Sequence, residues 1–182
     1  MVYVLLADGF EEVEALAPTD VLRRAEIPVM TAGVGGDVVR GAHSVNIICD
    51  TTVDEIEKDS VDGIILPGGM PGTLNLQADK KVNELIEYCK DNELMIAAIC
   101  AAPMILGELG ILDGKAAVCF PGFEEHLHGA EICDCYVVSD DNVITARGAG
   151  AALEFGEAIV DYFAGLDGSG REILEQMQYP LI

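Results

Sequence analysis

The chain has 182 residues, of which 51% are hydrophobic and 23% charged, a composition that predicts one globular domain over residues 1–182. Its 32 acidic and 10 basic side chains give a formal net charge of -22. Because this charge repels phosphate groups, we expect neither direct nucleic-acid binding nor membrane binding. The first residues do not resemble a signal peptide, and six scattered cysteines favour reduced thiols, so we expect a cytoplasmic protein.

Apolar runs alternate with amphipathic segments along the chain. Strands are predicted at residues 2–7, 27–34, 44–50, 61–69 (where the strand runs into a double-glycine turn), 94–100 and 116–120, with a hairpin at 136–146. Helices are predicted at residues 11–26, 79–93, 102–110, 151–165 and 170–178. Pro18 is expected to kink or break the first helix. This alternation predicts an α/β fold with a mainly parallel sheet.

Three loops follow predicted strands: "DGFEE" (8–12), "PGGMPG" (67–72) and "CAAP" (100–103). Ligands in such folds bind beyond the carboxyl ends of the strands. If the three strands are neighbours, the acids of the first loop and helix, the paired glycines of the second loop and Cys100 meet in one small site. Taken singly, the loops also fit an ordinary turn, a solvated first turn of a helix and a buried cysteine.

A thiol nucleophile would use what these loops supply. Cys100 precedes a predicted helix, whose dipole favours a thiolate. Backbone N–H groups of the "PGG" turn and of Ala101 could bind an oxyanion. Glu11 and Glu14 share one face of the first helix, so either carboxyl group could move a proton. Helical spacing does not choose between them.

Four segments together resemble the ThiJ/PfpI superfamily, on its DJ-one-like and bacterial ThiJ-like branch: "ADGFEEVEALAPTDVLRRA", "DGIILPGGMPGTLNL", "IAAICAAP" and "ITARGAGAALEFGEAIV". The resemblance implies a flavodoxin-like three-layer sandwich with a mainly parallel central sheet and helices on both faces. It implies a homodimer with an interface around residues 16–24, and neither a cofactor nor a metal.

The resemblance also implies roles for individual residues. Cys100 is expected to be a nucleophile in a strained elbow, with a protonated Glu14 hydrogen-bonded to its sulfur. Gly69 and Ala101 are expected to supply oxyanion-binding N–H groups. The remaining residues of the expected pocket are Gly9, Glu11, Gly68, Ala102, Pro103 and Phe120.

Two departures from the superfamily remove histidines. Ala101 stands where peptidase-type members carry a histidine, and Phe120 stands where the animal proteins carry one. Glu14 must therefore carry the proton transfers alone. His126 and His128 lack the spacing to cysteines that structural zinc sites use, so no metal site is expected there.

The activities that the resemblance implies are a glutathione-independent glyoxalase, converting 2-oxoaldehydes such as methylglyoxal to 2-hydroxy acids, and deglycation of early adducts on proteins or nucleotides. The small residues around Cys100 predict a small substrate pocket. One alternative is a sensor of oxidative stress or a redox-regulated chaperone without turnover. Another is a role in thiazole monophosphate metabolism, although the chain shows no phosphate-binding glycine loop ending in Lys-Ser/Thr.

Overall fold

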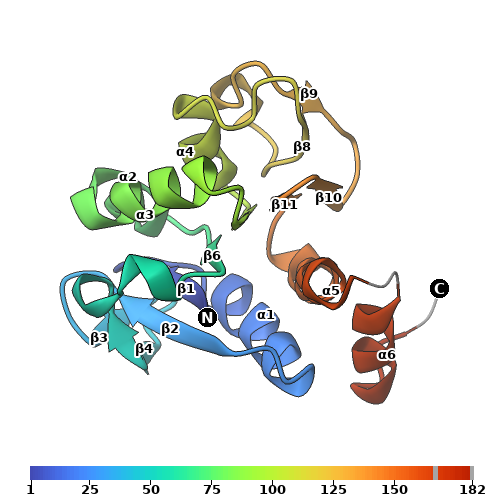
Figure 1. Cartoon of the computed structure of the whole chain (residues 1–182), viewed down its shortest axis with the longest axis horizontal. Coiled ribbons are helices and arrows are strands. Elements are labelled where there is room, and N and C mark those ends of the chain that lie inside the picture. The colour runs from blue at the N-terminus through green and yellow to red at the C-terminus, as the bar shows by residue number, and fades with distance from the viewer. Residues whose placement is uncertain (166–167, 181–182) are drawn as a thin grey trace.

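The structure is a computed structural model that describes residues 1–165 and 168–180 (Figure 1). Its central sheet has seven strands, in the spatial order β10 (Val137–Asp140), β11 (Val143–Ala146), β7 (Met95–Ile99), β6 (Gly63–Leu66), β1 (Val2–Leu6), β2 (Val29–Gly33) and β5 (Thr51–Thr52). All neighbouring strands run parallel except the β10–β11 hairpin. The predicted parallel sheet with a hairpin at 136–146 is confirmed.

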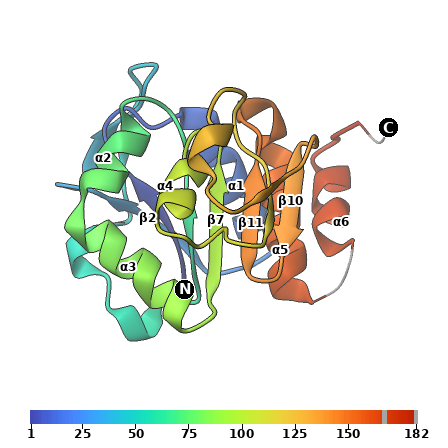
Figure 2. The same ribbon diagram turned by 90° about the horizontal axis from the view of Figure 1, so that it is seen from above.

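Helices cover both faces of this sheet (Figures 1 and 2). One face carries α1 (Glu12–Arg24), α5 (Ala152–Ala164) and α6 (Ser169–Gln176), and the other carries α2 (Gly72–Ala78), α3 (Lys80–Asp91) and α4 (Pro103–Glu108). Successive strand residues point to opposite faces, so Leu5 and Ile64 join one core, and Leu6 and Ile65 the other. Burial on both faces explains the continuous apolar strands of the sequence. The predicted three-layer α/β sandwich is confirmed.

The first helix is not broken at Pro18. Helix α1 runs without interruption from Glu12 to Arg24, although proline lacks the N–H that a helix interior uses. Pro18 is buried where α1 packs on α5, and a Cβ added to Gly156 of α5 would lie 3.1 Å from the Pro18 Cα atom. This close helix packing offsets the lost hydrogen bond. The prediction of a break was therefore wrong.

Two smaller pairs of strands lie outside the central sheet. The segment predicted at 44–50 forms β4 (Asn46–Ile48), which pairs antiparallel with β3 (Val38–Arg40). The strand predicted at 116–120 shrinks to β8 (Ala116–Ala117), paired with β9 (Glu131–Ile132). The next N–H, that of Val118, donates to the Thr145 hydroxyl at 3.0 Å. Short 3₁₀ turns occur at Val53–Glu55, Lys58–Ser60, Glu124–His126 and Ala149–Ala151.

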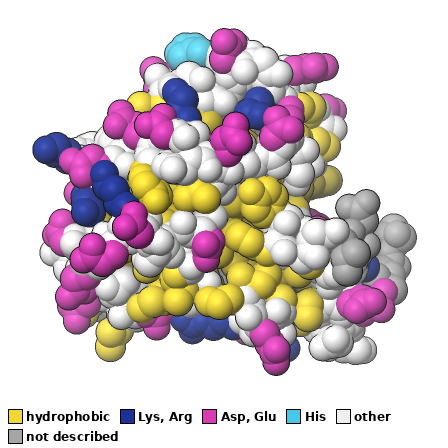
Figure 3. Space-filling view, in the orientation of Figure 1, with side chains coloured by type: hydrophobic (Ala, Val, Ile, Leu, Met, Phe, Trp, Pro, Cys, Tyr) yellow, Lys and Arg dark blue, Asp and Glu magenta, His cyan; other side chains and the backbone are white. Residues whose placement is uncertain are grey.

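The surface is strongly acidic, as the composition requires. Acidic side chains are spread over the face shown in Figure 3, and a band of hydrophobic side chains crosses its middle. Among the residues that the structure describes, every helix is too short or too polar to cross a bilayer.

Candidate active site

The three loops singled out in the sequence meet at one edge of the sheet. Strands β1, β6 and β7 are consecutive neighbours and run parallel, so their carboxyl ends lie together. The loop after β1 leads into α1 and Glu14, the loop after β6 contains the paired glycines, and Cys100 follows β7 directly. A fourth loop joins them, because β11 lies beside β7 and is followed by residues 147–151.

Cys100 adopts a backbone conformation that non-glycine residues rarely use. Strand β7 ends at Ile99, and Cys100 has φ +65° and a partly exposed side chain. Its N–H donates to the Ala146 carbonyl at 2.8 Å, and its own carbonyl accepts the Phe120 N–H at 2.8 Å. Such a conformation costs about 1–3 kcal/mol and persists because its surroundings hold it. Cys100 is thus not an ordinary buried cysteine at the end of a strand.

Glu14 is a buried acid directed at this thiol. Its side chain is 1% exposed, and Oε2 accepts the Gly68 N–H at 2.9 Å. The Cys100 side chain and the Ala149 N–H also lie close enough to lower its pKa. Burial raises the pKa of Glu14 to about 7, and these contacts oppose the rise only in part. Glu14 is therefore not one of the solvated acids of an ordinary first helical turn.

The same surroundings raise the pKa of Cys100. Burial is the largest cause, the Glu14 charge adds to it, and the pKa of the thiol reaches about 12 although the N–H groups of Ala101 and Gly69 lower it. Two adjacent buried anions are unfavourable, so Cys100 and Glu14 retain one proton between them at neutral pH. A thiolate therefore depends on Glu14 holding that proton. The helix dipole expected to stabilise it is weak, because α4 begins only at Pro103 and has 6 residues.

The turn after β6 requires paired glycines because neighbouring atoms lie too close to its backbone to leave room for side chains. A Cβ added to Gly68 would lie 2.7 Å from both the Cys100 Cβ and the Glu14 Oε2 atoms. Gly69 has φ +89°, and an added Cβ would lie 2.4 Å from the Glu11 nitrogen. Only glycines let this turn pass so near the pair. The N–H groups of Gly69 and Ala101 both lower the pKa of the Cys100 thiol.

The structure spreads the other residues of the expected pocket over several places. These residues are Gly9, Ala102, Pro103 and Phe120. Gly9 is hydrogen-bonded to the segment that follows the glycine turn, because its carbonyl accepts the Gly72 N–H at 3.2 Å. Ala102 and Pro103 are buried at the start of α4, and Ala102 belongs to the core. Phe120 is 47% exposed and lies beside the site, with its ring near Gly148.

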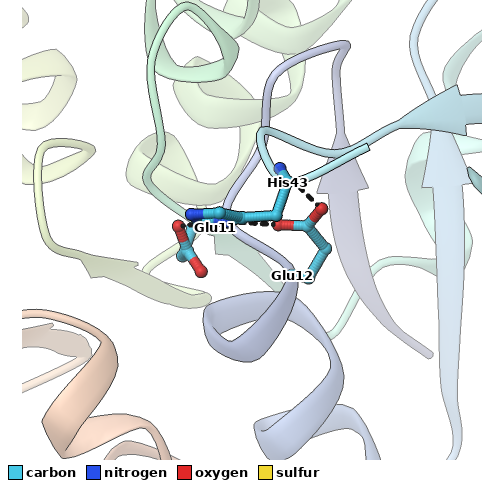
Figure 4. Close-up of side chains that lie close together, drawn as sticks. All are labelled: Glu11, Glu12 and His43. Atoms are coloured by element: carbon cyan, nitrogen blue, oxygen red, sulfur yellow. Dashed lines mark hydrogen bonds and ion pairs between the residues drawn. The ribbon is translucent and has the colours of Figure 1, made fainter. Parts of the chain in front are cut away.

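Glu11 and Glu12 meet His43 of the β3–β4 connection, as Figure 4 shows. Glu12 is 8% exposed; its Oε1 accepts the N–H groups of His43 at 2.8 Å and Val45 at 3.3 Å, and its Oε2 lies 3.0 Å from the His43 Nδ1 atom. The Glu11 Oε2 atom lies 3.4 Å from the same nitrogen. These contacts raise the pKa of His43 and lower that of Glu12, and they clamp α1 to the β3–β4 hairpin.

This clamp also has the donor atoms of a metal site, since its three ligand atoms lie within 4.8 Å of one another. Sequence reasoning missed it, because His43 is 31 residues from Glu12 and no spacing rule links them. It also missed Gly148 and Ala149, which lie against Glu14. The signal for these two was available: "RGAG" follows a predicted strand, as the other three loops do.

Comparison with known proteins shows the family of the chain. The family model described as "DJ-1/PfpI family" matches residues 1–162 of the chain. The chain is 38% identical to protein dj-1beta of Drosophila melanogaster over 89% of this chain and 88% of the relative. It is 32% identical to the glutathione-independent glyoxalase DJR-1.2 of Caenorhabditis elegans, over 89% and 87%.

A solved structure agrees as well. A cysteine-to-alanine mutant of a DJ-1 superfamily protein from Salmonella typhimurium superposes with a TM-score of 0.92 at 32% identity, covering 99% of this chain and 98% of the other. The chain belongs to the DJ-1/PfpI family, and the predicted membership in the ThiJ/PfpI superfamily is confirmed.

The raised pKa of Glu14 makes stability depend on pH. Folding raises this pKa from 4.5 to about 7, so the folded state binds more protons between these values and loses stability as pH rises through 7. A pKa rise of this size corresponds to a loss on the order of 3 kcal/mol. Urea unfolding of the wild type and of Glu14→Gln, which cannot titrate, should show this loss between pH 4.5 and about pH 8 only in the wild type.

Glu87→Gln, an exposed substitution on α3, is the matched control and should follow the wild type. Parallel curves for the wild type and Glu14→Gln would show that Glu14 titrates alike in the folded and unfolded chains, contrary to the structure.

Proposed function

We propose that the protein is a glutathione-independent glyoxalase that converts 2-oxoaldehydes to 2-hydroxy acids, with Cys100 as nucleophile and Glu14 as acid and base. The observation that carries this proposal is a partly exposed thiol beside a buried carboxyl group whose pKa is raised to about 7. A catalytic acid–base group works best when its pKa is near the working pH. The family membership and the relative named as a glyoxalase support the same activity.

The first step forms a carbon–sulfur bond. Glu14 accepts the thiol proton while the Cys100 sulfur attacks the aldehyde carbon, and the carbonyl π electrons move to the oxygen. The N–H groups of Gly69 and Ala101 would stabilise this alkoxide, each by about 3–4 kcal/mol when well aimed. Glu14 then returns its proton to the oxygen, which gives a neutral hemithioacetal and leaves the base free.

The second step moves a hydrogen from C1 to C2. Glu14 removes the C1 proton and delivers it to the C2 oxygen, which gives an enediol. Glu14 then takes the proton of the C1 hydroxyl as the C1 carbonyl forms and delivers it to C2. These transfers oxidise C1, reduce C2 and leave a thioester on Cys100. Water hydrolyses the thioester, releases the 2-hydroxy acid and restores the thiol. The net change is addition of one water molecule.

Attack of the same sulfur on an early glycation adduct would account for deglycation, which we include in the proposal.

A peroxide sensor without turnover would use the same thiol, because peroxide also reacts with a thiolate. Product formation separates the enzyme from such a sensor. The homodimer stays a prediction from the resemblance. The cytoplasmic location, expected from the first residues and the cysteines, and independence of a cofactor also stay predictions.

Product analysis tests the two catalytic residues. Incubation with methylglyoxal in the absence of glutathione should give lactate with the wild type and none above background with Cys100→Ser. Glu14→Gln should lower kcat/KM by about 100-fold or more, because general acid–base catalysis contributes roughly 10²–10⁴. Cys133→Ser removes another partly exposed thiol and should leave lactate formation unchanged. Equal lactate from Cys100→Ser, or none from the wild type, would refute the proposal.

The rate should follow the protonation of the pair. Below about pH 7 both members hold a proton, so neither can act as a base, and kcat/KM should fall about tenfold per pH unit. Above pH 7 it should level off. Initial rates of lactate formation between about pH 5 and pH 9 measure this profile. A midpoint near 4.5, the ordinary value for a glutamate, would contradict the assigned role of Glu14.

A further inference from the structure

A pocket of about 350 Å³ lies beside the loop after β11, whose Gly148 approaches the Glu14 carboxyl group. It is formed by the segment after β8 and the loop after β11, and its walls are Phe120, Pro121, Tyr136, Arg147 and residues 148–151. Pockets that hold drug-sized ligands measure roughly 300–1,000 Å³, far more than a three-carbon aldehyde needs. The small substrate pocket predicted from the sequence was inferred only from the residues next to Cys100.

This pocket is joined to the reacting groups through the backbone. The N–H of Phe120 donates to the Cys100 carbonyl at 2.8 Å, which ties one wall to the nucleophile. A Cβ added to Gly148 would lie 3.2 Å from the Phe120 ring and 4.0 Å from the Glu14 Oε1 atom. The N–H of Ala149 bonds Glu14. Bare backbone therefore separates the pocket from the catalytic carboxyl group.

The walls of the pocket are mainly apolar and aromatic. Phe120 and Tyr136 are 47% and 65% exposed, although aromatic rings gain from burial. The Tyr136 carbonyl accepts the Arg147 N–H at 2.9 Å, which fixes the tyrosine beside the loop after β11. The Arg147 guanidinium lies 3.0 Å from Asp134, so its charge is already compensated. A flat apolar group fits such walls better than an anion does.

We infer that this pocket binds the substituent of the substrate, and that the preferred substrates are 2-oxoaldehydes with an aromatic or similarly large apolar substituent. The inference rests on the proposed glyoxalase function. With the aldehyde carbon at Cys100 and the ketone carbon at Glu14, the substituent extends past Gly148 to the two rings. Phenylglyoxal is the matching probe: it gains one water molecule, its C1 is oxidised, its C2 is reduced, and the product is mandelate.

The test compares phenylglyoxal with methylglyoxal in each variant. Mandelate and lactate are measured, because loss of phenylglyoxal also reports its reaction with arginine side chains. Tyr136→Ala should lower the ratio of kcat/KM for phenylglyoxal to that for methylglyoxal about tenfold, through the lost aromatic contact. Tyr136→Phe keeps the ring and should keep the ratio. Tyr162→Ala on α5 removes a tyrosine outside the pocket and should leave both values unchanged.

The outcomes separate this inference from the function beneath it. An unchanged ratio in both Tyr136→Ala and Phe120→Ala, with wild-type turnover of methylglyoxal intact, would overturn the substrate class and leave the glyoxalase. Absence of any Cys100-dependent product from either aldehyde would overturn both.

Discussion

One proton shared by Cys100 and Glu14 is the constraint on which the site depends. Burial opposes charge on both groups, and each anion would raise the pKa of the other, so the pair cannot lose both protons near neutrality. The carboxyl group, with its pKa at about 7, can take the proton when sulfur attacks and return it afterwards. The proposed chemistry therefore needs no separate base.

The fold holds Cys100 and Glu14 together, and this arrangement strains the backbone of Cys100. Three consecutive parallel strands bring their carboxyl ends together, and a fourth supplies the loop that meets Glu14 from the other side. Cys100 keeps its positive φ because its N–H is bonded to Ala146 of β11 and its carbonyl to the N–H of Phe120. A side chain at Gly68 would collide with the Cys100 Cβ atom and the Glu14 carboxyl group. The same Phe120 bond joins the backbone of Cys100 to one wall of the aromatic pocket.

Periodicity was sufficient to predict the layers of the fold, and the loop positions were sufficient to bring Glu14, Gly68, Gly69 and Cys100 together. Helical spacing alone could not choose Glu14 over Glu11; that choice came from the resemblance. The structure separates the two, since Glu14 is 1% exposed against Cys100 while Glu11 faces His43. Local patterns could not show that packing against Gly156 would carry α1 through Pro18, or that His43 would meet Glu12 across 31 residues. Both depend on contacts between distant segments, as does the pocket beside Phe120.

The most direct measurement is the titration of the Glu14 carboxyl carbon by NMR in the protein labelled with ¹³C at glutamate, assigned with Glu14→Gln. If the pair shares one proton, the Glu14 resonance titrates with a midpoint near pH 7. A midpoint near 4.5 would mean that Glu14 ionises independently of burial and of Cys100, and would contradict the account.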